Sequence, residues 1–307
     1  MEKTNNDKEW KVVKLASIDD YNKLYGLPTL HPLVSVIDLK KATKIANHIK
    51  MDYGVFALFL KNNDSCRVLY GREAYDYQEG TVTSFSPGQI ISVEMKQNEF
   101  APDAIGLVFH PDIFYGTPLG DKINSFRYFD YSQREALHLS ETERTLFIEC
   151  VEKINQELQH PVDHHTASVI SANILVLLEY IDRFYDRQFI TRHKVNSDIV
   201  ANFERQLREY YNDPHCDTVP NVAYFADKAN LTPGYFGDLV KKETGITAQD
   251  TISRHIINVA CQRLSATDND ISIIAYDLGF QYPQHFSRLF KRITGQSPTE
   301  YRKIRSN

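Results

Sequence analysis

The chain has 307 residues, of which 42% are hydrophobic and 24% are charged, as in an ordinary globular protein long enough for two or three domains. Its four cysteines form no closely spaced pair, which argues against a disulfide scaffold or a zinc ribbon. No apolar run approaches the ~18 residues that a membrane span needs, and the first residues lack the apolar segment of a secretory signal. We therefore expect a cytoplasmic protein with no membrane partner.

Residues 1–139 are predicted to be rich in β-strands. Short apolar runs at Val55–Leu60, Thr81–Phe85 and Ile105–Phe109 are separated by turn-forming segments. Several short strands at this spacing are typical of a small barrel or sandwich.

Residues 140–187 are predicted to form a helical pair that completes the N-terminal domain. Ser140 and Glu143 have the spacing of a capping box, and apolar residues then recur at helical intervals. The second helix is expected over about Thr166–Phe184. The pair could pack on the β-rich region or against a second copy of the chain, and the sequence leaves both arrangements open.

The remainder is predicted to be a polar linker, residues 188–198, followed by an all-helical domain, residues 199–307. Helix starts are expected at Thr218, Thr232 and Asp270. The expected fold class is thus α+β, with a β-rich N-terminal part and a helical C-terminal part.

Charge is distributed unevenly along the chain, whose formal net charge is −5. The segment from Arg192 to the end carries 15 Lys and Arg against 13 Asp and Glu, whereas the rest carries 20 against 27. From His285 onward, six basic residues face one acidic residue, Glu300. A local basic region on an otherwise acidic protein is what a DNA-contacting surface requires.

One sequence pattern occurs twice at an interval of fifty positions. The stretch YFGDLVKKETG at Tyr235–Gly245 is repeated as HFSRLFKRITG at His285–Gly295. On a helix, each copy places its apolar residues on one side and its polar, basic residues on the other. A short helical stretch precedes each copy, and Gly279 lies where the turn between the two helices needs a positive φ. Asn230, at the corresponding turn of the first copy, suits that conformation less well.

These features predict two helix-turn-helix units, with recognition helices at about 233–243 and 282–292. Between them, a helix over about Ala248–Leu264 would be ~25 Å long. That length suits two recognition helices that enter successive major grooves, about one DNA turn or ~34 Å apart.

The segment Ile274–Arg302, IAYDLGFQYPQHFSRLFKRITGQSPTEYR, resembles the C-terminal domain of the AraC/XylS family of bacterial transcription regulators. The resemblance covers about 90 residues, from about Thr218 to Arg305. More weakly, the N-terminal half resembles the cupin-like barrel that many family members use for effector binding or dimerisation. The partners implied are double-stranded DNA, a second copy of the chain, RNA polymerase and a small-molecule effector.

Residues of both predicted recognition helices and of their starts are candidate DNA contacts. The resemblance places Asp238 where the family often has a basic or amide side chain, and Gly237 offers no side chain. The first recognition helix should therefore contact fewer bases, with the second dominating sequence choice. The candidates are Thr232, Gly234, Tyr235, Gly237, Asp238, Lys241, Lys242, Gln281, Tyr282, Pro283, Gln284, His285, Arg288, Lys291 and Arg292.

An enzymatic or ligand-binding role for the β-rich domain is the alternative, with the helical domain as an accessory. His31, His48 and His110 are isolated, and no hydrolase, P-loop or zincin motif is present, so we expect no catalytic residues, no metal and no cofactor. Clustered aromatic residues could line an effector pocket or fill the domain core. The candidate effector-binding residues are Phe56, Tyr70, Arg72 and Tyr77. Neither the effector nor the choice between activation and repression can be deduced from the sequence.

Overall fold

The computed structural model describes residues 10–62, 66–70, 73–74, 80–95, 103–132, 135–211, 218–267 and 269–305. Its internal contacts divide the chain into an N-terminal unit, residues 1–188, and a C-terminal unit, residues 189–307. No helix among the described residues is long and apolar enough to cross a membrane.

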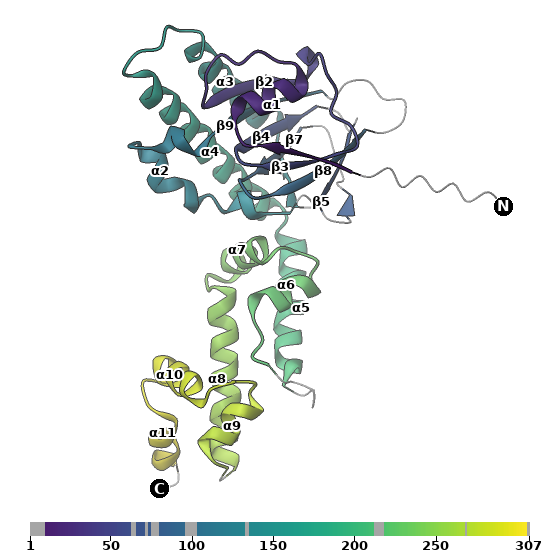
Figure 1. Cartoon of the computed structure of the whole chain (residues 1–307). Helices are drawn as coiled ribbons and strands as arrows, with labels where there is room; N and C mark the ends of the chain where they lie inside the picture. The colour runs from purple at the N-terminus through teal and green to yellow at the C-terminus, as the bar shows by residue number, and fades with distance from the viewer. Residues whose placement is uncertain are drawn as a thin grey trace, which may run out of the picture. The chain divides into compact units, whose positions relative to one another are not determined.

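Two five-stranded sheets form the framework of the N-terminal unit (Figure 1). The first has the order β1 (Lys11–Leu15), β3 (Ile49–Tyr53), β8 (Ile90–Met95), β5 (Cys66–Tyr70) and β6 (Glu73–Ala74). The second has the order β10 (Leu137–His138), β7 (Thr81–Phe85), β4 (Phe56–Lys61), β9 (Ala104–Phe109) and β2 (Val34–Asp38). Only the β1–β3 pair is parallel among the strand pairs of the described residues.

The central strand β4 is buried on both faces, which explains why its sequence is a continuous apolar run rather than an alternating one. Ala57 and Phe59 point into the core between the sheets. Leu58 and Leu60 point the opposite way and are fully buried.

Helices α3 (Glu141–Glu157) and α4 (Thr166–Thr191) complete the unit (Figure 1). The capping box of Ser140 and Glu143 begins α3, as predicted. The apolar faces of both helices are buried within this one chain, with α3 against β2 and β9. Packing on the sheet, one of the two arrangements that the sequence left open, is therefore the one observed.

Arg187 of α4 joins the two helices to each other and to the second sheet. The Arg187 guanidinium donates to both carboxylate oxygens of Glu143 at 2.9 and 2.7 Å and to the His138 carbonyl at 2.6 Å. Partial burial opposes ionisation of Glu143, but the bonds from Arg187 and from Ser140 outweigh it and hold the pKa of this carboxyl below its usual value.

The N-terminal unit also contains shorter elements. These are α1 (Ile18–Tyr25), α2 (Pro118–Lys122) and the 3-10 turns η1 (Leu39–Lys41), η2 (Pro111–Phe114), η3 (Ile123–Ser125) and η4 (Arg127–Asp130).

The C-terminal unit consists of helices, as predicted. They are α5 (His193–Tyr210), α6 (Val222–Lys228), α7 (Pro233–Thr244), α8 (Ala248–Ala266), α9 (Ile271–Asp277), α10 (Pro283–Thr294) and α11 (Pro298–Arg305). Of residues 188–198, predicted to be the linker, all except Arg192 are helical: α4 continues to Thr191 and α5 begins at His193. The expected helix start at Thr218 is wrong: α6 begins at Val222, where the Asn221 side chain accepts from the Tyr224 N–H.

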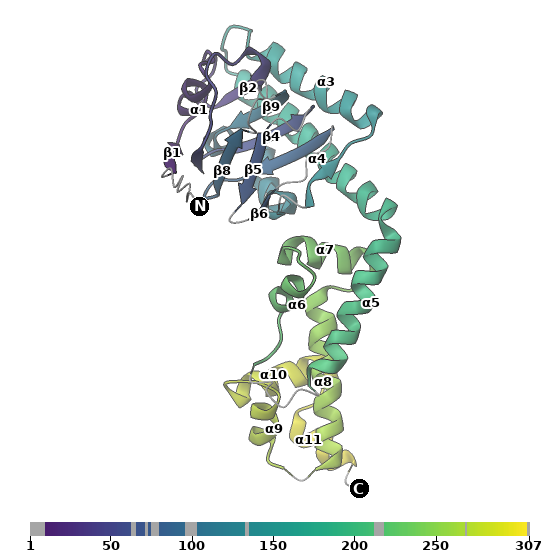
Figure 2. The ribbon, with the colours of Figure 1, turned by 90° about the vertical axis from the view of Figure 1, so that its right-hand side faces the viewer.

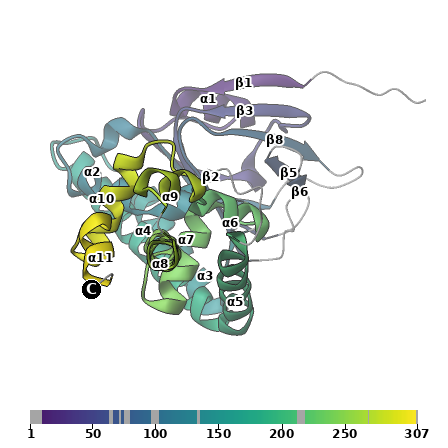
Figure 3. The same cartoon turned by 90° about the horizontal axis from the view of Figure 1, so that it is seen from below.

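Helix α8 is the axis of the C-terminal unit. Helices α6 and α7 gather at one end of it, and α9, α10 and α11 gather at the other (Figure 2). Seen along α8, α5 lies on one side and α10 with α11 on the opposite side (Figure 3). The buried side of α8 includes Ile252, Ile256, Ala260 and Leu264. Its 19 residues make it ~28 Å long.

Candidate nucleic-acid interface

Helices α6 and α7 form the first motif, and helices α9 and α10 form the second motif. In the first, the backbone N–H of Leu231 donates to the Ala226 carbonyl at 2.9 Å, after Asn230 with φ 54°. In the second, the N–H of Phe280 donates to the Ala275 carbonyl at 3.0 Å, after Gly279 with φ 84°. Each turn therefore closes with one residue in the left-handed conformation and with an equivalent hydrogen bond.

The turn of the second motif is one residue longer than that of the first. The turn of the first motif ends with Thr232, the N-cap residue of α7. The Thr232 hydroxyl accepts from the Tyr235 N–H at 3.3 Å, whereas Tyr282 makes no side-chain cap for α10. Pro233 and Pro283 each occupy the first turn of their helix, where an N–H would have no helical partner.

The two recognition helices also end alike. The hydroxyl of Thr244 donates to the Val240 carbonyl, and that of Thr294 donates to the Phe290 carbonyl, at 2.8 and 2.9 Å. Gly245 and Gly295 follow in left-handed conformations. The repeat in the sequence thus corresponds to a repeat in the hydrogen bonds.

The apolar faces of both recognition helices are removed from water. On α7, Phe236, Leu239 and Val240 are fully buried, and on α10 the same holds for Phe286 and Phe290. Each helix packs on α8 and on the preceding helix of its own motif. This packing fixes which face each recognition helix presents outward.

The outward face of α10 is polar and basic. It consists of five exposed side chains over three turns of helix, preceded by the exposed Gln281 and Tyr282, and Pro283 is partly buried. The rings of Tyr282 and His285 lie 5.5 Å apart, edge to face. The five side chains are Gln284, His285, Arg288, Lys291 and Arg292.

The outward face of α7 offers much less. Lys241 and Lys242 are exposed, but Asp238 occupies the position equivalent to Arg288. Three further candidates are partly exposed, Thr232, Gly234 and Gly237. Of these, only Thr232 has a polar side chain, a hydroxyl. Tyr235 is 4% exposed, with its ring 4.9 Å from that of Phe189, so its side chain belongs to the packed interior.

Some of the basic residues near the second motif serve the fold instead. Arg263 of α8 donates to the Asp277 carbonyl at 3.0 Å, and Arg302 donates to the Asn269 carbonyl at 2.7 Å. The Tyr211 hydroxyl donates to the Leu278 carbonyl at 3.3 Å. These bonds satisfy carbonyls at both ends of α9 and hold the second motif in place. The sequence alone does not separate these arginines from the outward-facing ones.

The structure describes two of the four candidate effector-binding residues. Phe56 is half-buried in a cluster of phenylalanine rings, Tyr70 lies on β5, and Arg72 and Tyr77 lie outside the described residues. Burial raises the pKa of the Cys150 thiol, which disfavours a reactive thiolate there. The described residues contain no cluster of three His, Cys, Asp or Glu side chains that could hold a metal.

Comparison with known proteins identifies the type of domain in the C-terminal unit. Residues 225–304 match the helix-turn-helix domain family. The regulatory protein SoxS of Escherichia coli is 28% identical over 113 residues, covering 37% of this chain and 97% of that protein. The arabinose operon regulatory protein of Escherichia coli is 31% identical over 111 residues, covering 35% of this chain and 38% of that protein. The C-terminal unit therefore carries a helix-turn-helix domain, and that domain is of the AraC type.

A third relative extends the match toward the N-terminal unit. The raffinose operon transcriptional regulatory protein RafR of Pediococcus pentosaceus is 35% identical over 145 residues, covering 47% of this chain and 52% of that protein. The chain thus matches about two fifths to one half of the length of the two operon regulators.

Proposed function

We propose that the protein is a sequence-specific DNA-binding regulator of transcription. One observation carries this proposal. Two motifs with matched turns and helix ends pack on one helix, α8, and the second motif presents an exposed polar and basic face. The similarity to transcription regulators supports it.

Helix α10 is assigned the main part in sequence recognition. Gln284 and Arg288 lie one turn apart on its outward face and carry the side chains suited to paired hydrogen bonds with adenine and guanine edges. Lys291 and Arg292, one turn further on, are positioned for phosphates.

Helix α7 is assigned a supporting part. Lys241 and Lys242 supply positive charge for the phosphates, but the Asp238 carboxylate is repelled by the DNA backbone and can accept only from a base amino group such as that of cytosine. The half-site under α7 should therefore tolerate more base changes than the half-site under α10.

Selection of genomic DNA fragments by the full-length protein, at roughly 50 and 200 mM salt, tests this function. We expect a motif with two half-sites about one turn apart, the more strictly defined half lying under α10. Sequence-independent binding, or no binding at either salt concentration, would contradict the proposal. The second outcome would favour a ligand-binding or enzymatic N-terminal unit with an accessory helical domain.

We further propose that the protein binds as a homodimer through its N-terminal unit. Val169 and Val176 on α4 are 38% and 49% exposed, which leaves an apolar strip on the outer side of that helix. Sedimentation of the full chain at about micromolar concentration should give a dimer whose association weakens when both valines are replaced by Asp. A monomer at all concentrations would contradict this.

A further inference from the structure

The space between the two sheets of the N-terminal unit is filled by the protein's own aromatic rings. Tyr21 of α1 lies 6.4 Å from Tyr53 and 6.0 Å from Phe59, measured between ring centroids. Tyr53 in turn stacks on Phe85 at 5.2 Å. All four side chains are less than 6% exposed. The core between the sheets thus consists of packed side chains.

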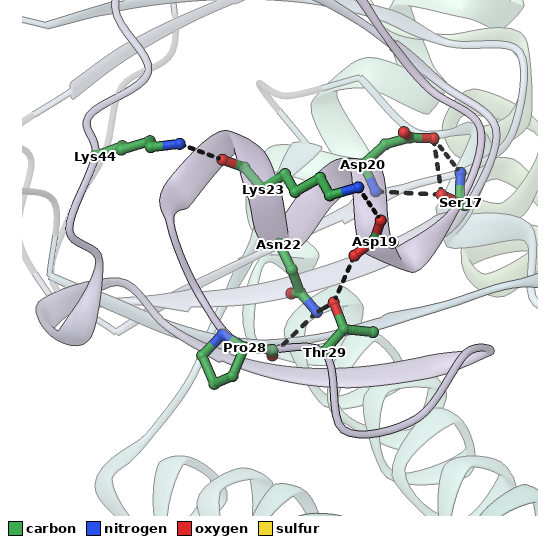
Figure 4. Close-up of polar contacts among 8 residues, drawn as sticks. All are labelled: Ser17, Asp19, Asp20, Asn22, Lys23, Pro28, Thr29 and Lys44. Carbon is green, nitrogen blue, oxygen red and sulfur yellow. Dashed lines mark hydrogen bonds and ion pairs between the residues drawn. The ribbon is translucent and has the colours of Figure 1, made fainter.

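Helix α1, which supplies Tyr21, is held by a set of polar contacts (Figure 4). The Ser17 hydroxyl and the Asp20 carboxylate form a capping box at its start. The buried Asn22 amide donates to the Pro28 carbonyl and to the Thr29 hydroxyl at 3.3 and 3.0 Å. These contacts keep Tyr21 inserted between the sheets.

A groove of about 430 Å³ lies on the opposite side of the second sheet. This volume is within the range of small-molecule sites, which are mostly apolar with a few polar groups. Most of its lining is aromatic or proline. The lining residues are Phe56, Ser86, Pro87, Pro111, Phe114, Ile123, Asn124, Phe126, Phe129 and Asp130.

Phe56 is the centre of the aromatic wall. Its ring stacks on Phe109 at 5.3 Å with an interplanar angle of 9°. Phe114 and Phe129 approach it at 5.5 and 5.0 Å, at steeper angles. Phe56 is partly exposed, while Phe114 and Phe129 are buried, so these rings are fixed by their packing before any ligand arrives.

The polar groups of the groove include one charged group, a carboxylate, which favours a ligand with positive charge. They are the Ser86 hydroxyl, the Asn124 amide and the Asp130 carboxylate, and no Lys or Arg is among the lining residues. An ammonium group is attracted both by a carboxylate and by the faces of aromatic rings. An anion would meet a negative charge with no compensating cation in the lining.

We propose that this groove, which we call the phenylalanine groove, binds a small organic cation with an ammonium group on an apolar body. The apolar body lies against Phe56, Phe114 and Phe129, and the ammonium group lies toward Asp130. The site differs from the core between the sheets, and its occupation does not depend on DNA binding.

Three probes with one ring and different charge test the proposal. Phenethylammonium, 2-phenylethanol and phenylacetate are titrated into the full-length protein, and heat or chemical-shift changes give each Kd. We expect the cation to bind with a Kd of about 1 mM or tighter, then the alcohol, then the acid. Equal binding of the cation and the alcohol would overturn the charge argument. No binding of any probe at 10 mM, on the order of the weakest specific binding, would overturn the site.

Two variants locate the binding. Asp130→Asn should lower the preference for the cation over the alcohol by about threefold to fivefold, since the exposed carboxylate is screened by water. Asp121→Asn changes a carboxylate that is also exposed but lies outside the groove lining, and it should leave the preference unchanged. Asn124→Trp places a large ring at an exposed position of the groove wall and should weaken the binding of every probe at least tenfold. Unchanged binding in Asn124→Trp, with an unchanged melting temperature, would show that the probes bind elsewhere.

Discussion

The first and second motifs have similar backbones and each buries an apolar face, but their outward faces differ. The hydrogen bonds of their turns and their final threonines correspond, and the buried Phe236 corresponds to the buried Phe286. Their outward faces do not, since Asp238 stands where the second motif has Arg288. The features that two helices need in order to pack are therefore repeated, while those that would contact bases are present mainly in one copy.

The largest expected effect tests the equivalence of the buried faces. Phe236→Ala removes a fully buried ring beside Phe203, and Phe286→Ala removes a fully buried ring beside Phe280 and Phe290. Each should lower the free energy of unfolding of the C-terminal unit by about 3–5 kcal/mol. Urea unfolding followed by circular dichroism measures both. A loss in one variant several times larger than in the other would show that the two motifs are not equivalent in packing.

The next effect concerns the turn of the second motif. At Gly279, with φ 84°, an added Cβ would lie 2.3 Å from the Thr218 carbonyl carbon. Gly279→Ala should therefore destabilise the unit by about 3 kcal/mol, from the left-handed conformation and the collision together. Gly295→Ala is the matched control, because φ is 79° there and nothing lies within 4 Å of the added atom. This control substitution should lower the free energy of unfolding by only about 1–2 kcal/mol. Equal losses of unfolding free energy in the two variants would mean that Thr218 moves aside freely.

A smaller effect, on DNA affinity, should distinguish the outward face of α10 from that of α7. Arg288→Ala should weaken binding to the selected DNA site by about 1–3 kcal/mol and relax the preference at one base position. Asp238→Ala, the equivalent change in the first motif, should cause no loss of affinity. Competition binding against random DNA measures both. If Arg288→Ala weakens binding to random DNA by the same factor, this arginine contacts only phosphate.

The smallest effect should be the same in both motifs. Lys241 and Lys291 are exposed and occupy equivalent positions near the ends of α7 and α10. Each change to Ala should lower the slope of log affinity against log salt by about 0.9, independently of the DNA sequence. Binding titrations over a series of salt concentrations give the slopes. A change in slope for Lys291 alone would place the first motif away from the DNA.

Local sequence signals were sufficient for the helical motifs. The proline at the start and the glycine at the end of each recognition helix set its bounds, and α7 and α10 lie within two residues of the predicted ranges. The strands β4, β7 and β9 were also found from their apolar runs. Tyr235 was placed among the DNA contacts although its side chain is buried, since its interior neighbour Phe189 is 46 positions away.

Non-local partners explain what the sequence did not predict. The parallel pairing of β1 with β3 joins residues nearly forty positions apart, and no local pattern specifies it. Tyr21 fills the space between the sheets only because α1 is folded against β1 and β2. The polar residues at 188–198 resemble a linker in composition, but polar residues also suit solvent-exposed faces of helices such as α5. The cupin-like description of the N-terminal unit stays a prediction.

The continuity of α8 restricts how the DNA site of such a protein can change. Inserting one residue within this helix would rotate the second motif by about 100° and move it by ~1.5 Å relative to the first. Inserting one base pair between two half-sites rotates them by only about 35°. A single insertion in the protein therefore does not compensate for a single insertion in the DNA. Over evolution, the spacing of the half-sites should stay constant while their sequences diverge.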